Sequence, residues 1–70
     1  EVGTTPHKWL TRQRILAARS LLEETDLGVE QIATDVGFHS GVVLREHFRR
    51  EIGLAPVEYR RRFVPPRTVS

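Results

Sequence analysis

Seventy residues make one small domain or part of a larger one, because a chain of this length buries only about 60 to 65% of its unfolded surface. The chain has no cysteine, which excludes a disulfide framework, a cysteine-ligated zinc finger and a cysteine nucleophile. The net charge is only +2. No apolar run approaches the length of about 18 residues that a membrane span needs, and the start lacks a signal-peptide pattern. We therefore expect a cytoplasmic protein with no membrane partner.

The first residues of the chain return near its end at a constant offset of fifty. Residues 1–9 match residues 51–59, with identity at the Glu, Gly and Pro positions and an aromatic residue at the last position of both segments. Glycine suits a helix C-terminus, and proline suits the first turn of the next helix. We therefore expect residues 1–5 to be the end of a truncated first unit and the chain, which has no Met, to be a piece of a longer protein.

A long helix is predicted from Pro6 to about Glu24. Thr5 is suited to cap it, and proline at the first helical position is harmless because no helical partner exists for its missing N–H. The helix would be roughly 28 Å long. We expect Trp9 to be an aromatic core anchor, because it matches Tyr59 in the repeat. The apolar stripe that faces the core contains Leu10, Ile15, Ala18, Leu21 and Leu22.

Three shorter helices follow. One starts near Gly28 or Val29 and ends near Val36, where Gly37 stops it. The next is capped by Ser40 and ends at Ile52, before Gly53. The residues expected to face the core from these two helices are Val29, Ile32, Ala33, Val36, Leu44, Phe48 and Ile52.

The last short helix runs from Ala55-Pro56 to Phe63, and both Tyr59 and Phe63 are expected to return to the core. Residues 64–70 contain two prolines and no apolar pattern, so we expect a disordered tail. No segment alternates like a strand, and the predicted fold class is therefore all-α.

The pattern Ile32-Ala33-x-x-Val36-Gly37-Phe38-x-Ser40, followed by Leu44 and Phe48, predicts two helices that cross sharply. Ala33 must be small because the second helix passes close over it. This is the logic of a helix-turn-helix unit, in which the second helix lies in the DNA major groove. We predict a three-helix unit of the homeodomain-like type over residues 25–63, preceded by a linker helix over residues 6–24.

With the apolar stripe inward, the outward positions early in the helix at 40–52 are expected to read bases. Arg45 can make two hydrogen bonds to guanine, Val42 can contact a thymine methyl group, and Gly41 lets the backbone come close. Glu46 can accept from cytosine, but we favour an ion pair with Arg49 or Arg50 at helical spacing.

Other residues are expected to bind phosphate. Donors near the start of the same helix, on His39 and Ser40, are candidates because a helix N-terminus favours anions. Arg49 lies one turn further on, and Arg60 is the candidate from the arginine run of the last helix. The charge pattern agrees, since residues 23–35 carry five acids and no base, whereas residues 44–63 carry six Arg against three Glu.

The chain resembles the DNA-binding region of AraC/XylS-type bacterial transcription regulators. The resemblance covers residues 1–63 and rests on the following matches: Gly3-x-x-Pro6-x-x-Trp9-Leu10, Arg14, Ala18, Leu21-Leu22, Ile32-Ala33, Val36-Gly37-Phe38-x-Ser40, Leu44, His47-Phe48 and Gly53-x-x-Pro56-x-x-Tyr59-Arg60. It implies a transcription regulator that binds double-stranded DNA through two helix-turn-helix units joined by a long helix. We expect this regulator to be an activator. An effector or dimerisation domain would precede them.

The chain departs from the family pattern in three ways. It contains one complete helix-turn-helix unit where the family uses two. Position 46 is Glu where the family often has a basic residue, and position 55 is Ala where Ser is common. The loss of a Ser cap costs roughly 1 kcal/mol.

The sequence gives weaker support to other functions. None of the three histidines forms the i, i+4 pair of a helical zinc site, and the Ser is better explained as a cap than as a nucleophile. We therefore expect no enzyme activity, no metal and no cofactor. The main alternative is a protein-interaction module that contacts RNA polymerase or a partner domain. A third interpretation is a piece of a DNA-repair methyltransferase, because the same motif occurs fused to such enzymes.

Overall fold

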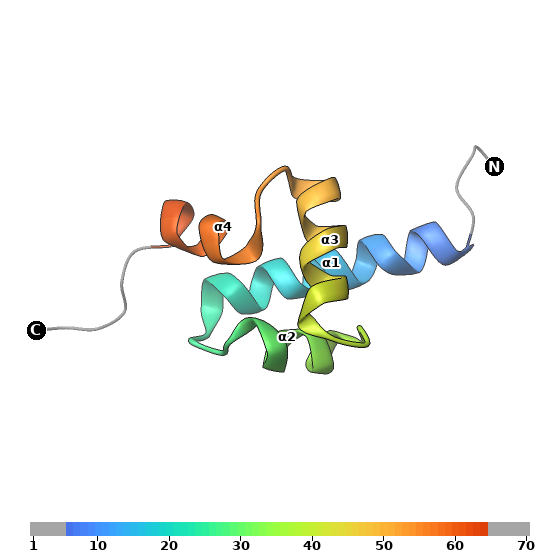
Figure 1. Ribbon diagram of the computed structural model, residues 1–70, viewed down its shortest axis with the longest axis horizontal. Helices are drawn as coiled ribbons and strands as arrows, with labels where there is room; N and C mark the ends of the chain where they lie inside the picture. Colours follow the sequence, from blue (N-terminus) through green and yellow to red (C-terminus); the bar gives the residue numbers. More distant parts are fainter. Residues whose placement is uncertain (1–5, 65–70) are drawn as a thin grey trace, which may run out of the picture.

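The computed structural model describes residues 6–64 and contains helices alone within that range (Figure 1). The four helices are α1 (Pro6–Glu24), α2 (Val29–Val36), α3 (Gly41–Ile52) and α4 (Pro56–Phe63). The all-α prediction and all four helix positions are therefore confirmed. The predicted end of a first unit at residues 1–5 lies outside the described residues, as does the predicted tail apart from Val64.

The helix ends follow from local sequence. Gly37 and Gly53 both have positive φ, of 99° and 96°, a backbone region that costs other residues about 1 kcal/mol or more. Gly37 donates its N–H to the carbonyls of Ala33 and Thr34. At the start of α3, the Ser40 hydroxyl accepts the N–H of Val43 at 3.4 Å, which confirms the predicted cap.

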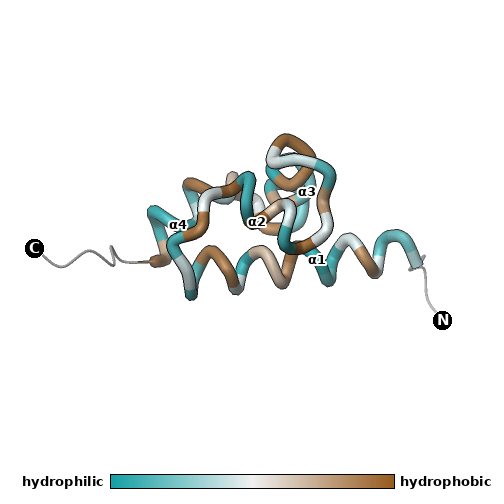
Figure 2. The backbone as a smooth tube through the Cα atoms, turned by 90° about the horizontal axis from the view of Figure 1, so that it is seen from below, coloured by the Kyte–Doolittle hydropathy of each residue, from teal (hydrophilic) through white to brown (hydrophobic). Residues whose placement is uncertain are grey.

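The core lies where α1, α2 and α3 meet. Figure 2 shows α2, α3 and α4 on the same side of α1. Each fully buried Leu, Ile or Phe contributes about 1.5 to 3 kcal/mol. The buried apolar residues are Ile15, Ala18, Leu22, Ile32, Ala33, Phe38, Leu44 and Phe48. Complete burial of Ala33 agrees with the close helix crossing that the sequence predicts.

Three residues predicted to face the core are exposed instead. Trp9 is 57% exposed, Leu10 40% and Phe63 61%, so these expectations were wrong for the described structure. The cause for Trp9 and Leu10 is their position, because the buried residues of α1 begin only at Ile15 and the first turns project away from the other helices (Figure 1). Phe63 contacts the ring of Tyr59 at a centroid distance of 5.0 Å and lies at the end of α4.

Helix α4 is fastened to the end of α1 by Tyr59. The Tyr59 hydroxyl donates to the carboxylate of Glu23, and its ring meets Phe48 edge-on at a centroid distance of 5.7 Å. Burial raises the pKa of Tyr59, and the hydrogen bond to Glu23 and that carboxylate's charge raise it further. Tyr59 therefore joins α1, α3 and α4, as the sequence predicts for this aromatic residue.

Candidate nucleic-acid interface

The turn between α2 and α3 is held by a stack of three side chains. Phe38 is buried, and the His47 ring lies parallel to it at a centroid distance of 5.5 Å. The guanidinium carbon of Arg14 lies 5.9 Å from the centroid of the Phe38 ring, within the range of a cation–π contact. Because Arg14 comes from α1, Phe38 from the turn and His47 from α3, the stack fixes how α3 is rotated about its axis.

This rotation turns one face of α3 outward. Val42, Arg45, Glu46 and Arg49 are all exposed, and their spacing of three and four residues places them together on the helix surface. Val42 is 58% exposed, which is notable for an apolar side chain. The predicted outward orientation of these four residues is confirmed.

Gly41 does not belong to this outward face. It is buried, and a Cβ added to it would collide with the carboxylate of Glu30. Its N–H donates to Glu30 Oε1 at 3.1 Å, so neither its surface nor its amide is open. The expectation of an outward-facing Gly41 was wrong because Glu30 from α2 covers it.

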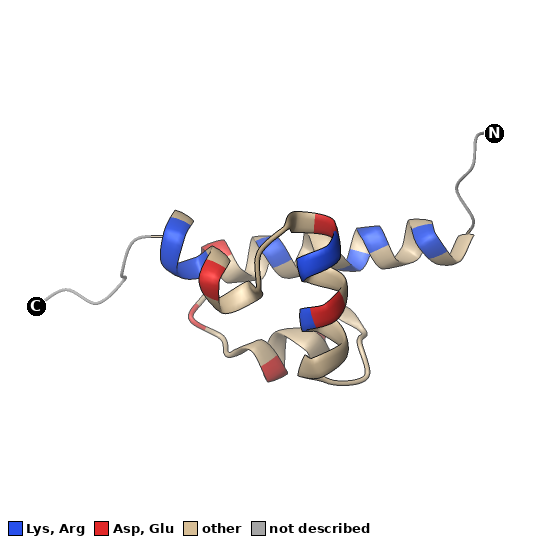
Figure 3. Ribbon diagram, turned by 45° about the horizontal axis from the view of Figure 1, so that its top comes forward, with Lys and Arg blue, Asp and Glu red and all other residues tan. Residues whose placement is uncertain are grey.

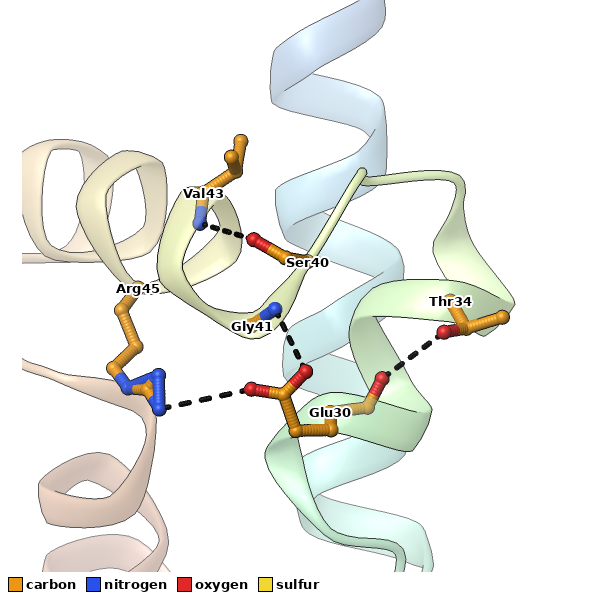
Figure 4. Close-up of polar contacts among 6 residues, drawn as sticks. All are labelled: Glu30, Thr34, Ser40, Gly41, Val43 and Arg45. Atoms are coloured by element: carbon orange, nitrogen blue, oxygen red, sulfur yellow. Dashed lines mark hydrogen bonds and ion pairs between the residues drawn. The ribbon is translucent and has the colours of Figure 1, made fainter.

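Glu30 is the residue that sequence reasoning missed. Its second carboxylate oxygen lies 3.8 Å from Nη2 of Arg45, so that one carboxylate contacts both the start of α3 and its outward arginine (Figure 4). The side chains of Arg45 and Glu30 remain 45% and 71% exposed. In the sequence Glu30 is one acid within an acidic segment, and its partners are 11 and 15 positions away, beyond any helical spacing.

The structure assigns different surroundings to the predicted phosphate-binding residues. His39 and Arg49 are exposed, and Ser40 is half-buried with its hydroxyl accepting a backbone N–H. This leaves the hydroxyl hydrogen of Ser40 as its available donor. These three residues stay compatible with an anion beside the start and outer face of α3.

Arg60 corrects the prediction for the last helix. Its guanidinium donates to three backbone carbonyls, those of Leu22 at 3.1 Å, Leu27 at 2.7 Å and Thr25 at 2.9 Å. All three donor nitrogens are thus used to tie α4 to the last turn of α1, which ends at Glu24, and to the loop that follows it. The geometry gives Arg60 a structural role, while its neighbours Arg61 and Arg62 are exposed.

The charged residues form ion pairs between helices rather than within α3. Among the described residues, no ion pair joins Glu46 to Arg49 or Arg50, and the pairs that join different helices include Arg45 with Glu30 and Arg12 with Glu51. The expected pairing of Glu46 is therefore absent from this structure. Figure 3 shows Lys and Arg along α1 and at the end of α4, whereas α3 carries both signs.

An open groove of about 400 Å³ separates the first turns of α1 from α3. It is lined by His7, Lys8, Thr11, Arg12, His47, Arg50 and Glu51.

Within residues 6–64, no three His, Asp or Glu side chains are grouped to hold a metal ion. None of α1 to α4 combines the length and the apolar character that crossing a membrane requires.

A family model described as a helix-turn-helix domain matches residues 1–62. The chain is 41% identical over 63 residues to the HTH-type transcriptional regulator Rv1931c of Mycobacterium tuberculosis, covering 90% of this chain and 24% of that protein. It is also 41% identical over 58 residues to the HTH-type transcriptional activator RhaS of Escherichia fergusonii, covering 83% of this chain and 21% of that one. The chain thus spans about a quarter of the length of these relatives or less.

Two solved structures have the same fold. The DNA-binding domain of the global transcriptional factor AdpA, in complex with a target DNA, matches with a TM-score of 0.82 and 47% identity, over 86% of this chain and 54% of that one. The C-terminal domain of AraT, a response regulator of Geobacillus stearothermophilus, matches with a TM-score of 0.89 and 28% identity, over 100% of this chain and 58% of that one. These likenesses confirm the helix-turn-helix arrangement.

Proposed function

Because the chain belongs to the AraC-type helix-turn-helix family, we propose that it binds double-stranded DNA sequence-specifically, with α3 in the major groove. The family is one of transcription regulators, not enzymes. The observation that carries the proposal is the exposed face of α3, where Val42, Arg45, Glu46 and Arg49 lie together. An α-helix about 10 to 12 Å wide fits the major groove, which is about 12 Å wide.

Each residue of this face has a chemical role in the proposal. Arg45 donates to guanine O6 and N7, Val42 packs on a thymine methyl group, and Glu46 accepts from cytosine N4. Arg49, together with His39 and Ser40, binds phosphate. Gly41 and Arg60 are left out, because the first is covered by Glu30 and the second is used by backbone carbonyls.

The exposed first turns of α1 support a larger architecture. We assign Trp9 and Leu10, which are 57% and 40% exposed, to the contact with a preceding helix-turn-helix unit. The 19 residues of α1 extend about 28 Å, which suits two recognition helices about one DNA turn, or 34 Å, apart. An effector or dimerisation domain upstream completes a cytoplasmic regulator, and the name of the relative RhaS favours activation.

Selection from a randomised duplex library tests the proposal. The wild-type chain is expected to enrich one sequence and to bind it in the micromolar range, with affinity that falls steeply as salt rises. Arg45→Ala should cost about 1 to 3 kcal/mol of binding free energy and relax the preference at one base pair. Arg61→Ala removes the same charge from the exposed side of α4 and should weaken binding uniformly or not at all.

A chain that enriches no sequence and binds DNA without salt dependence would contradict DNA recognition. The alternative, a surface for RNA polymerase or a partner domain, would then remain. It predicts that substitutions on the α3 face impair a protein contact and leave DNA affinity unchanged.

A further inference from the structure

We propose that Glu30 determines base specificity by positioning Arg45, which it holds toward the bases and away from the phosphates. This inference rests on the function proposed above, because it gives a role to a residue that supports the base-reading arginine. Glu30 belongs to the first turn of α2, so the residue that positions the base-reading arginine of α3 comes from a different helix. It is a positioning residue, since its action on DNA passes through Arg45.

The Glu30 carboxylate is held at one oxygen and leaves the other for Arg45. Oε1 accepts the N–H of Gly41 at 3.1 Å, one of the backbone donors that the start of a helix leaves unpaired. Oε2 lies 3.8 Å from Nη2 of Arg45 (Figure 4). The partial positive charge at the start of α3 also favours a carboxylate there.

The absence of a side chain at Gly41 leaves room for the Glu30 carboxylate. Any Cβ at this position would collide with the Glu30 carboxylate. Gly41 is the first residue of α3, outside the helix interior where glycine costs about 1 kcal/mol relative to alanine. Glycine at position 41 therefore leaves the room in which the Glu30 carboxylate approaches the Gly41 N–H.

The exposure of the pair points to orientation rather than to folding. With 45% of the Arg45 side chain and 71% of the Glu30 side chain accessible, an ion pair adds little to stability. At 3.8 Å the contact is an ion pair and not a hydrogen bond, so the donors of Arg45 stay available for a guanine. The adjacent negative charge also weakens the attraction of Arg45 to phosphate, which carries no sequence information.

Glu30→Gln is the informative variant. It keeps an oxygen for the Gly41 N–H but removes the charge that holds Arg45. The matched control is Glu24→Gln, which removes the same charge from the exposed end of α1. The probes are the duplex enriched by the wild type, the same duplex with its Arg45-dependent base pair replaced, and an unrelated duplex.

Glu30→Gln is expected to bind the unrelated duplex more tightly than Glu24→Gln does. It should also lower discrimination at the Arg45-dependent base pair by up to about fivefold, the upper range for an exposed ion pair. In an Arg45→Ala background, Glu30→Gln should leave discrimination unchanged. Gly41→Ala, which displaces the carboxylate, should reproduce the loss, and circular dichroism confirms that each variant is folded.

The outcomes separate the two proposals. If Glu30→Gln matches Glu24→Gln on all three duplexes while Arg45→Ala loses its base preference, the positioning role is overturned and the proposed function stands. An equal loss of discrimination with and without Arg45 also overturns it, because Glu30 would then act on DNA by another route. If the wild type enriches no sequence, both proposals fall.

Discussion

Arg60 shows how one side chain can close a helix that belongs to a distant part of the chain. Its guanidinium reaches the carbonyl of Leu22, in the last turn of α1, and those of Thr25 and Leu27, in the loop that follows the helix; the last turn of a helix leaves its carbonyls without helical partners. The planar guanidinium presents its donors on three nitrogens that are set apart in space, whereas a lysine carries its three donors on one nitrogen and does not match the same three carbonyls.

Arg60→Lys is therefore expected to lower the free energy of unfolding by about 1 to 3 kcal/mol, the range for lost hydrogen bonds to a charged group. Urea denaturation monitored by circular dichroism measures this change. Arg61→Lys is the matched control on the exposed side of the same helix, and its unfolding midpoint should stay at the wild-type value. Equal midpoints for the two variants would contradict the structural role of Arg60.

Tyr59 gives stability a dependence on alkaline pH. Its pKa is raised in the fold, so the folded chain favours the neutral phenol. The stabilisation is fully present below the unfolded pKa of about 10 and is lost as pH rises through the higher folded pKa. The difference in unfolding free energy between the wild type and Tyr59→Phe should shrink above about pH 10, and a difference that stays constant there would contradict this linkage.

At the scale of the elements, the helix ends at Gly37 and Gly53 have the same backbone conformation, but the atoms that surround the two glycines differ. An added Cβ at Gly37 would lie 3.1 Å from Nε of Arg14, whereas one at Gly53 would meet open space. The glycine at the α2–α3 turn therefore also makes room for the stack of Arg14 on Phe38 that holds α3 in place.

Alanine substitutions distinguish these contributions. Gly37→Ala and Gly53→Ala should each lose about 1 kcal/mol from the positive φ, and Gly37→Ala should lose more because Arg14 must move. Gly28→Ala is the control for positive φ, because Gly28 has a φ of −74° and no atom within 4 Å of the added Cβ. Gly28 is also the N-cap of α2, where alanine is less favourable than glycine, and the lower entropy of the unfolded alanine chain offsets this loss. The stability of Gly28→Ala should change by less than about 0.5 kcal/mol, and thermal unfolding ranks the three variants. A loss at Gly28 as large as at Gly53 would show that backbone strain is not the cause.

Local sequence predicts these elements well because each helix end depends on residues a few positions apart. Gly37, Ser40 and Gly53 all act on backbone groups within four residues. The contacts of Glu30 and Arg60 could not be predicted in the same way, because their partners lie up to 15 and 38 positions away. Some of these partners are backbone N–H and C=O groups, which are the same in almost every residue and leave no signal in the sequence. The outward face of α3 was predictable except at Gly41, whose burial depends on Glu30.

At the scale of the whole molecule, Trp9 and Tyr59 occupy equivalent positions in the sequence repeat, but their surroundings in the structure differ. Tyr59 packs against Phe48 of α3, while Trp9 is 57% exposed on the projecting part of α1. The proposed preceding unit would supply the missing neighbour for Trp9.

Fluorescence of Trp9 tests this architecture, because it is the chain's one tryptophan. In the 70-residue chain its emission should resemble that of tryptophan in water and be quenched efficiently by acrylamide. A longer chain with a complete preceding unit that lacks tryptophan should show blue-shifted emission and weaker quenching. Emission that is identical in the two chains would contradict packing of that unit on Trp9.

The contact of Arg60 with the end of α1 also has a consequence for the order in which the chain folds during synthesis. Its farthest acceptor precedes it by 38 residues, so α1, α2 and α3 are synthesised before the residue that contacts the end of α1. Until α4 has been made, the carbonyls that Arg60 will bind are left to water, and we expect this end of α1 to fray. The contacts at the C-terminal end of α1 are thus completed only when α4 has been added.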